Sequence, residues 1–424
     1  MLTLQILREQ TDIVLEGLKK RNFKDAESLV QQIIDNDKLR RETQNTLDTL
    51  KAKSNADSKK IGELIRAGKA DEANTLRAAI ALDKDKLKAL EDGLTEFERK
   101  QQEILYKIPN VPASKVPVGK SAEDNINVHE HGTVPTLPAD ALPHWELIKK
   151  YDIIDFDLGI KIAGAGFPVY KGKGARLQRA LINFFLNEAG QAGYKEIQPP
   201  IVVNEASGYG TGQLPDKEGQ MYFVNEDGLY LIPTAEVPIT NLYRDVILTE
   251  DELPIKNVGY TPCFRREAGS WGAHVRGLNR LHQFDKVEIV QISKPEDSHT
   301  ILDQMCLHVQ GLLEKLELPY RKLLLCGGDM GFNSAITYDM EVFSAAQQRW
   351  LEVSSVSNFE TFQANRLKLR YKNKEGKMQL LHTLNGSALA LPRIVAALLE
   401  NNQTKDGIKI PKVLVPYTGF EIIN

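Results

Sequence analysis

Two heptad repeats, separated by one glycine-containing break, dominate the first hundred residues. Their apolar positions alternate by four and three residues, which is the pattern of a coiled-coil seam. The break at 66–69 places Gly68 where a tight turn between helices is needed. Two long helices joined by so short a turn must run antiparallel. The seam positions are Leu29, Ile33, Asn36, Arg40, Thr43, Leu47, Leu50, Ser54, Asp57, Ile61 and Leu64, then Leu76, Ile80, Asp83, Leu87, Leu90, Leu94, Phe97, Gln101 and Ile104.

This pattern predicts a coiled-coil hairpin over about 26–106, forming an arm roughly 55–60 Å long at a rise of 1.5 Å per residue. Taken alone, such an arm more often serves dimerisation or spacing. Its lysines offer a second interpretation, because cations on an exposed arm can contact RNA phosphates. The candidates are Lys51, Lys53, Lys59, Lys60 and Lys69, each of which also fits an ordinary solvated face.

A proline-rich segment separates this arm from the rest of the chain. We expect a helical arm over 1–108, a linker over 109–120 and one further domain over 121–424. After the linker, short apolar runs mix with helical stretches without regular strand–helix alternation, which predicts an α+β fold with an antiparallel sheet. Neither G-x-x-x-x-G-K-[ST] nor G-x-G-x-x-G after a strand occurs, so a bound nucleotide would need another kind of site.

Charge and cysteine content restrict the partners and the cellular compartment that we expect for this protein. The net charge of −3 gives no global polycation signal, so a nucleic-acid partner must be met by local patches. Cys263, Cys306 and Cys326 have no C-x-x-C spacing, which predicts neither a zinc cluster nor a disulfide framework. The sequence shows no secretory leader and no apolar run long enough to span a membrane. We therefore expect a cytoplasmic protein with no membrane partner.

The stretch 261–290 is the strongest candidate for a ligand site. Two alternating runs, Cys263–Glu267 and Leu281–Val290, predict antiparallel strands joined by a glycine-containing loop. Alternation places Arg265 and Glu267 on one face of the first strand, and His282, Phe284, Lys286 and Glu288 on one face of the second. Charged groups make a poor core, and this mixture suits a nucleotide beside an amino acid. A solvated hairpin with routine ion pairs fits the periodicity equally well.

Three shorter motifs offer further polar groups. Thr234-Ala-Glu236 follows an apolar strand and suits either a small ligand or a helix cap. In Glu352-Val-Ser-Ser355, carboxylate and hydroxyl oxygens suit Mg²⁺, although a solvated edge strand has the same pattern. Strict alternation would place Glu352, Ser354 and Val356 on one face. The run from His382 to Arg393 predicts a strand, a turn and a helix over 394–400, which could aim amides and a guanidinium at an anion.

Taken together, these motifs resemble a known family. FRREAGSWGAHVRGL followed by RLHQFDKVE resembles the strand–loop–strand of class II aminoacyl-tRNA synthetases, and specifically of seryl-tRNA synthetases. EVSS before NFETFQANR, and HTLNGSALALPR, match the same family. The family pattern differs at four places, namely Arg266, the loop-tip pair Ala273-His274, Ala388 and Pro392. The resemblance implies a class II catalytic core with an N-terminal coiled-coil arm.

The resemblance also implies an activity. It implies activation of L-serine with ATP to seryl-adenylate, followed by transfer of serine to the 3′ end of tRNA(Ser), and it leaves open whether tRNA(Sec) is also charged. Arg265 and Arg393 would be catalytic. Serine would be bound by Thr234, Ala235, Glu236, Arg265, Glu288, Asn385 and Ser387. ATP would be bound by Arg265, Arg266, Glu267, Leu281, Phe284, Glu352, Val353, Ser354, Ser355 and Arg393, with Mg²⁺ held by Glu352 and Ser355.

Assembly and partners follow from the same resemblance. The helix over 175–192 and the following strand and prolines resemble the family's dimer-forming element, so we expect a homodimer. The arm would grip tRNA(Ser), and the loop tip would meet ATP and then the acceptor end. Two alternatives are a catalytically idle relative that binds a partner through the arm, and a coiled-coil scaffold that keeps only the fold.

Overall fold

The computed structural model describes residues 1–216, 218–267 and 276–424. The chain forms two compact units. One unit consists of Leu2–Lys19 and Phe23–Pro109, and the other consists of Met1, Lys20–Asn22 and Asn110–Asn424. No helix in the described ranges combines the length and the apolar character needed to cross a membrane.

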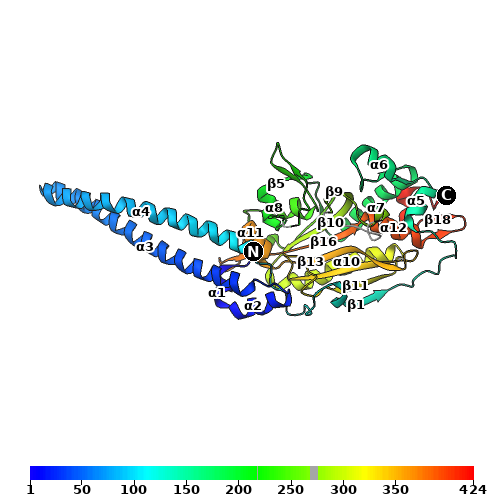
Figure 1. The fold of residues 1–424 in the computed structure, drawn as a ribbon, viewed down its shortest axis with the longest axis horizontal. Helices are drawn as coiled ribbons and strands as arrows, with labels where there is room; N and C mark the ends of the chain where they lie inside the picture. The colour runs from blue at the N-terminus through cyan, green and yellow to red at the C-terminus, as the bar shows by residue number, and fades with distance from the viewer. Residues whose placement is uncertain (217, 268–275) are drawn as a thin grey trace. The chain divides into compact units, whose positions relative to one another are not determined.

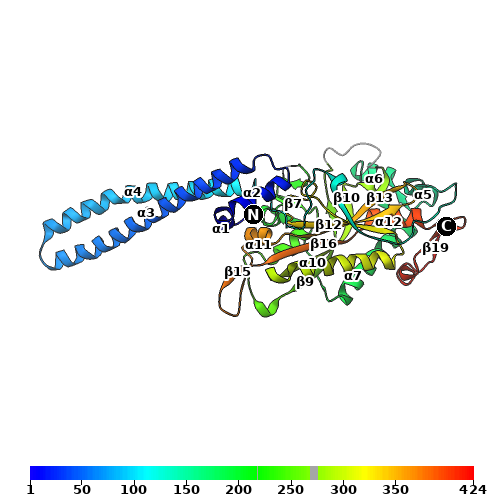
Figure 2. The ribbon, with the colours of Figure 1, turned by 90° about the horizontal axis from the view of Figure 1, so that it is seen from below.

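The first unit is the predicted hairpin. Helices α3 (Ala26–Arg66) and α4 (Ala70–Leu105) run side by side along their whole length (Figure 2), and the short helices α1 (Leu4–Glu9) and α2 (Thr11–Lys20) precede them. Every position of the two predicted seams is buried or partly buried. Gly68 in the turn has φ +75°, a conformation that a glycine adopts without strain. The hairpin, its two buried seams and its turn are thus as the heptads predict.

Polar seam positions in the arm are satisfied by specific partners. The Asn36 amide donates to the carbonyl oxygen of Phe97 at 2.9 Å. The Lys53 ammonium lies 2.9 Å from the carboxylate of Asp83 on the facing helix, and Lys51 lies 2.7 Å from Glu91. Buried polar groups need such partners, so these contacts fix the register of the two helices. Lys69 also lies 2.9 Å from Glu72, so three of the five lysines considered for RNA contact have carboxylate partners within the arm.

An eight-stranded sheet forms the centre of the second unit (Figure 1). Every neighbouring pair is antiparallel except the last, where β4 runs parallel to β9. The fold is therefore α+β with an antiparallel sheet, as predicted. The order is β1 (Ile126–His131), β11 (Tyr320–Leu324), β12 (Ile336–Ser344), β13 (Arg349–Asn358), β16 (His382–Ala390), β10 (Gln283–Ser293), β9 (Ile255–Phe264) and β4 (Lys195–Glu196).

Three helices pack their apolar sides on this sheet: α7 (Gly172–Gln191), α10 (Ser298–Lys315) and α12 (Leu391–Asn401). Figure 2 shows α7 and α10 lying along the same side of the sheet. Alternate residues of β10, such as Val287 and Ile289, join these helices in one large core. The residues between them, including Lys286 and Glu288, must point to the opposite face. Burial of one face thus determines which polar side chains line the other.

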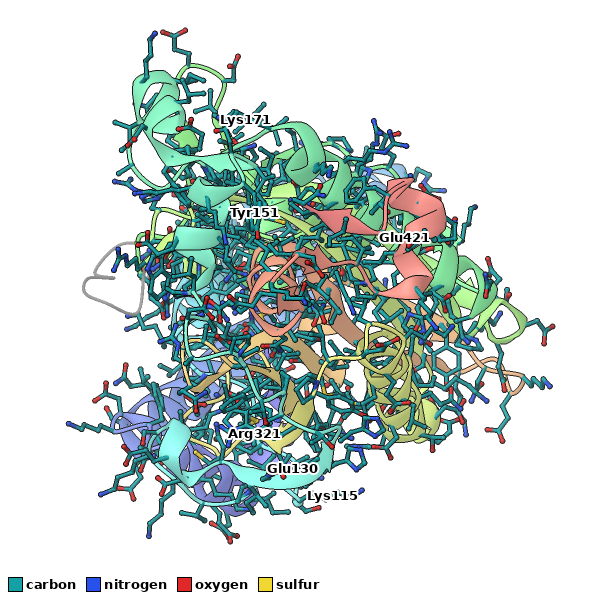
Figure 3. All side chains as sticks on the ribbon, turned by 90° about the vertical axis from the view of Figure 1, so that its right-hand side faces the viewer. Lys115, Glu130, Tyr151, Lys171, Arg321 and Glu421 are labelled. Carbon is teal, nitrogen blue, oxygen red and sulfur yellow. The ribbon has the colours of Figure 1, made fainter. Side chains whose placement is uncertain are left out.

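At the far edge, β1 is exposed along its whole length. Its Glu130 is paired in register with Arg321 of β11, and both are labelled in Figure 3. The guanidinium of Arg321 also lies 4.8 Å from the ring centroid of Trp350.

The remaining described elements are α5 (His144–Lys150), β2 (Ile154–Asp155), α6 (Phe156–Ala163), β3 (Val169–Tyr170), β5 (Val202–Asn204), α8 (Glu205–Thr211), β6 (Phe223–Val224), β7 (Leu229–Leu231), α9 (Glu236–Asn241), β8 (Ile247–Thr249), η4 (Gly277–Asn279), α11 (Thr361–Leu367), β14 (Arg370–Lys372), β15 (Met378–Leu380), β17 (Gln403–Thr404), β18 (Gly407–Lys409), α13 (Val415–Thr418), β19 (Ile422–Ile423), and the short 3₁₀ turns η1 (Ala122–Asp124), η2 (Glu250–Glu252), η5 (Pro295–Asp297) and η6 (Lys412–Leu414).

Two details of the strand prediction are wrong. The first strand of the 261–290 stretch is β9, which begins at Ile255 and ends at Phe264, so Arg265 and Glu267 follow the strand instead of forming it. In β13, Met340 pairs with Ser354 and Glu341 pairs with Glu352, which leaves Val353 as the extra residue of a β-bulge. The bulge shifts the alternation by one residue, so Glu352 shares a face with Ser355 and not with Ser354 and Val356.

Candidate active site

Arg265 lies where β9 leaves the sheet, beside the aromatic residue of the next strand. Its backbone N–H donates to His282 at 3.0 Å, which extends the ladder by one residue. Because Phe284 pairs with Cys263 two residues earlier, Arg265 and Phe284 share a face. The guanidinium lies 5.3 Å from the ring centroid of Phe284, and its Nε donates to the carbonyl oxygen of Pro233 at 3.4 Å. A fixed cation thus lies next to a flat apolar surface.

A cluster of buried charges occupies the same face. Lys286 Nζ lies 2.6 Å from Glu288 Oε2 and donates to the Thr234 hydroxyl at 2.8 Å. Each of these side chains is almost fully buried. The sequence analysis placed Lys286 on this face but did not include it among the candidate site residues. Its alternation with Phe284 and Glu288, two candidate site residues, could have identified it. A buried carboxylate needs such a partner, so Lys286 is integral to the cluster.

Glu236 adds a second carboxylate from the first turn of α9. The Gln363 amide of α11 donates to Glu236 Oε1 at 2.6 Å, and Thr383 of β16 donates to Gln363 Oε1 at 2.6 Å. Burial, reinforced by the negative charge of Glu288, raises the pKa of Glu236 to about 7. Gln363 was also missed, because nothing in the sequence indicates that α11 packs on this loop. The site therefore contains a carboxyl group whose pKa is raised toward neutral pH.

Strand β16 closes one side of the cluster. Ser387 pairs in register with Glu288 and donates to its Oε2 at 3.3 Å, while Asn385 pairs with Val290 on the same face. Thr234 accepts a hydrogen bond from the N–H of Glu236 at 3.2 Å and another from Lys286 at 2.8 Å. The N-cap residue of α9 is Ala235, which forms no side-chain cap, so Thr234 belongs to the cluster and is not the cap of this helix. Ala235 is fully buried between these groups.

A second polar cluster lies on β13 and β12. Ser355 donates to Asp339 Oδ1 at 2.6 Å. Burial and the charge of Glu352 raise the pKa of Asp339 well above its usual value. In the described ranges no three His, Cys, Asp or Glu side chains converge as a metal site would require. Mg²⁺ usually takes only one or two protein carboxylates and completes its shell with phosphate and water. These oxygens therefore fit Mg²⁺ bound together with a polyphosphate.

Arg393 approaches this cluster from the first turn of α12. Its Nη1 donates to the carbonyl oxygen of Glu352 at 2.6 Å and lies 3.5 Å from Glu352 Oε2, while its Nε donates to the carbonyl oxygen of Asn279 at 3.1 Å. The helix begins at Leu391, earlier than predicted, with Pro392 in its first turn, where proline is tolerated. The ion pair is long and half exposed, so a phosphate could compete for the guanidinium.

The other predicted ATP contacts differ in accessibility. Arg266 is exposed, and its N–H donates to Gln220 at 2.9 Å. Glu267 forms a 2.8 Å ion pair with Arg280. The side chains of Leu281 and Val353 pack in the core, and Ser354 donates to the carbonyl oxygen of Ser387 at 2.5 Å. Only the backbone of these three residues remains for a ligand. The loop-tip pair Ala273-His274 lies outside the described residues.

Two family models match the chain. Residues 1–112 match the seryl-tRNA synthetase N-terminal domain, and residues 222–402 match the tRNA synthetase class II core domain (G, H, P, S and T). The serine–tRNA ligase of Salinibacter ruber is 50% identical over 426 residues, which cover 100% of this chain and 99% of that protein. The serine–tRNA ligase of Akkermansia muciniphila is 46% identical, with 100% and 99% covered.

Solved structures show the same similarity. The crystal structure of seryl-tRNA synthetase from Pyrococcus horikoshii complexed with ATP superposes with a TM-score of 0.93 at 32% identity, covering 100% of this chain and 99% of that one. The cytoplasmic serine–tRNA ligase from Naegleria fowleri in complex with AMP gives a TM-score of 0.88 at 25% identity, with 100% and 99% covered. The similarity therefore covers both compact units of the chain, the arm and the unit that contains the eight-stranded sheet.

Proposed function

The chain belongs to the seryl-tRNA synthetase family, and from this premise we propose how its residues divide the work of an ATP-dependent serine–tRNA ligase. One observation carries the assignment. The Arg265 guanidinium lies beside Phe284, on the sheet face that also carries the buried cluster of Lys286 and Glu288. A base-stacking surface, a cation for phosphate and a polar pocket for an amino acid are thus contiguous.

In the first step the serine carboxylate attacks the α-phosphorus of ATP, and pyrophosphate leaves in line. The carboxylate is already a nucleophile, so the step needs positioning and charge neutralisation instead of a general base. We assign Arg265 to the α-phosphate and the serine carboxylate, Phe284 to the adenine face and Arg393 to the distal phosphates. Glu267 and Arg266 contact the nucleotide from the strand end, together with the backbone of Leu281, Val353 and Ser354.

Glu352 and Ser355 are assigned to Mg²⁺, which when bound neutralises phosphate charge and orients the leaving group. The bulge at Val353 supports this pairing, because it puts both side chains on the ligand face of β13. Asp339 supports it as well. Burial and the nearby Glu352 charge both favour its neutral form, and a cation held by Glu352 would reduce that repulsion.

The serine pocket is assigned to Thr234, Ala235, Glu236, Glu288, Asn385 and Ser387, with Lys286 as a member that sequence reasoning missed. Two carboxylates and one lysine leave an excess negative charge when Glu236 is ionised, which suits the ammonium group of serine. Alanine would leave hydroxyl-binding groups unpaired, whereas exclusion of threonine depends on pocket size, the weaker discriminator.

In the second step a hydroxyl of the terminal ribose of the tRNA attacks the carbonyl carbon of seryl-adenylate, so that an ester bond forms, the acyl–phosphate bond breaks and AMP leaves. We assign tRNA(Ser) binding to the coiled-coil arm over about 26–106, and we propose the division into an arm at 1–108, a linker at 109–120 and a catalytic domain at 121–424. A homodimer through α7 and β4 is proposed because β4 is a two-residue strand at the edge of the sheet, where a second copy could pair with it. A cytoplasmic location is supported by three free, buried cysteines.

Serine-dependent exchange of labelled pyrophosphate into ATP tests the first step, and charging of tRNA(Ser) tests the second. We expect exchange with serine and not with glycine or alanine, and only weak exchange with threonine. Exchange with a different amino acid would refute the pocket assignment. Absence of exchange in folded protein would favour the idle relative, and exchange without charging would locate the defect in the arm or the loop tip. Charging of tRNA(Sec) in the same assay decides the breadth of the RNA substrate.

A further inference from the structure

A buried histidine–carboxylate pair lies away from the ligand face, between α5 and α12. His144 and Glu400 are both 0% exposed, and Nδ1 of the imidazole lies 2.7 Å from Glu400 Oε1. The backbone N–H of His144 donates to the same oxygen at 2.9 Å, and the Ser344 hydroxyl donates to the other oxygen. Burial alone would raise the pKa of Glu400, but these hydrogen bonds outweigh it and lower the pKa. Nothing in the proposed chemistry uses this pair.

The far side of the imidazole contacts the backbone of η4. The N–H of Leu278 donates to His144 Nε2 at 2.9 Å. Since Nε2 accepts this bond, the ring proton must be on Nδ1, where it is donated to Glu400. Gly277 packs directly on the ring. A Cβ there would come within 2.3 Å of Nε2, and its φ of +65° also favours glycine. The glycine, the imidazole and the carboxylate therefore form one fitted contact.

Helix α12 holds η4 at two points. Arg393 Nε donates to the carbonyl oxygen of Asn279, and Glu400, seven residues later on the same side of the helix, holds Leu278 through His144. Gln347 adds a third connection, because its amide donates to Glu400 Oε1 at 3.0 Å and its oxygen accepts from Asn279 Nδ2 at 3.1 Å. The peptide of Asn279, which orients the Arg393 guanidinium, is thus fixed by the buried pair.

We propose that His144 is a positioning residue for ATP activation, acting through η4 to hold the Asn279 carbonyl under Arg393. The inference rests on the proposed assignment of Arg393 to the distal phosphates. Glu400 fixes the tautomer and orientation of the imidazole, as carboxylates do for functional histidines. Without the imidazole acceptor, η4 is free to shift and the guanidinium loses its oriented partner. The effect must appear in the use of ATP and leave the serine pocket unaffected.

Two substitutions test the two ring nitrogens of His144 separately. The amide of His144→Asn reaches the Nδ1 position and keeps a donor for Glu400, whereas the carbonyl of His144→Gln reaches the Nε2 position and keeps an acceptor for Leu278. In serine-dependent pyrophosphate exchange, we expect His144→Asn to raise the KM for ATP about tenfold, with the KM for serine within about twofold of wild type. His144→Gln should recover most of that loss. His131→Asn on the exposed strand β1 is the matched control and should change neither KM.

Thermal unfolding of the same full-length variants separates positioning from folding. A structural role alone would lower the active fraction and kcat in both variants while leaving both KM values unchanged, and that result would overturn the inference. Equal recovery by Asn and Gln would overturn it too, since the Leu278 contact would then be irrelevant. Arg393→Ala tests the underlying assignment. If Arg393→Ala leaves the KM for ATP unchanged, the proposed function of Arg393 fails, whereas an effect at Arg393 without one at His144→Asn refutes only the positioning role.

Discussion

The guanidinium of Arg265 lies 5.3 Å from the centre of the Phe284 ring, although 18 residues lie between them in the sequence. The β9–β10 register brings them together by pairing Phe284 with Cys263. The Arg265 guanidinium, which we assign to the α-phosphate of ATP and the carboxylate of serine, therefore lies beside the Phe284 ring, on which the adenine base would stack. The contact also fixes the flexible arginine side chain before substrate arrives, which is the preorganisation that electrostatic catalysis requires.

Replacing Arg265 tests the centre of the proposal. We expect Arg265→Ala to lower kcat for serine-dependent pyrophosphate exchange by about 10²–10³-fold, the cost of removing one preorganised charge-stabilising group. Arg265→Lys should recover only part of the rate, because an ammonium cannot contact two anions with a planar fork. Arg370→Ala, at an exposed position of strand β14, is the matched control and should exchange normally. Wild-type rates in Arg265→Ala would remove Arg265 from the reaction.

Replacing Lys286 tests the buried charge cluster. Lys286→Met should lower kcat/KM for serine about 10–100-fold, because Glu288 and Thr234 lose the group that orients them. It should also destabilise the protein by about 3–5 kcal/mol, the usual cost of leaving a buried charge without its partner. Steady-state kinetics and denaturant unfolding measure the two effects. Lys372→Met, on the surface, should change neither kcat/KM for serine nor the free energy of unfolding. An unchanged KM for serine in Lys286→Met would contradict the assignment.

The pKa of Glu236 predicts how serine recognition depends on pH. The carboxyl titrates at about 7 before substrate binds, and its ionised form attracts the serine ammonium. As pH falls through 7, a growing fraction of Glu236 carries a proton that serine must displace. The KM for serine should therefore rise up to tenfold per pH unit below this value, while the KM for ATP stays nearly constant. A KM for serine that is flat between pH 6 and 8 would contradict the prediction.

The same pKa predicts a stabilising substitution. The folded-state pKa of Glu236 is raised from 4.5 to about 7, so the folded protein binds more protons than the unfolded chain between these values. Stability from this group is present at low pH and is lost as pH rises through 7. Glu236→Gln should raise the free energy of unfolding at pH 8 by on the order of 3 kcal/mol, at 1.36 kcal/mol per pKa unit. If the two proteins have equal free energies of unfolding at pH 8, burial does not destabilise the ionised form of Glu236 as proposed.

Glu352 and Ser355 predict a specific metal phenotype. Glu352→Gln should raise the Mg²⁺ concentration needed for half-maximal exchange about tenfold, with partial recovery at high Mg²⁺, because it removes one hard anionic ligand. Ser355→Ala should act in the same direction more weakly. Glu375→Gln, an exposed carboxylate, is the control. Titration of exchange rate against Mg²⁺ at fixed ATP measures the effect, and a curve that does not shift in Glu352→Gln would exclude it as a ligand.

The arm predicts a separation of the two reaction steps. Lys59 and Lys60 are exposed on α3, whereas Lys51, Lys53 and Lys69 form ion pairs within the arm. Charge reversal of Lys59 and Lys60 together should raise the KM for tRNA(Ser) about tenfold and reduce the salt dependence of charging, as loss of phosphate contacts does. Serine-dependent exchange should be unchanged. Lys405→Glu serves as the control, and normal charging in the double variant would exclude this face of the arm.

Local periodicity predicted much of this architecture. The heptads predicted the hairpin and the turn at Gly68, because apolar positions that repeat every seven residues lie on one side of each helix and are buried against the other helix. The register of the two helices was not predicted, because it depends on cross-helix contacts such as Lys53 with Asp83. Alternation in β10 placed Phe284, Lys286 and Glu288 on one face, and the structure agrees. Periodicity failed at β13, since a bulge inserts one residue and nothing in the Glu352–Ser355 run indicates where the partner strand accommodates it.

The sequence by itself determined the helical hairpin of the arm, the α+β class of the second unit and the motifs that identify the family. Only the tertiary structure decided that Lys286 and Gln363 belong to the ligand pocket, and that His144 reaches η4 through its buried imidazole. The physical reason is distance along the chain. Periodicity reports how a residue faces its own neighbours, whereas a buried charge or imidazole finds its partner on another element, and that partner is set only once the core has packed.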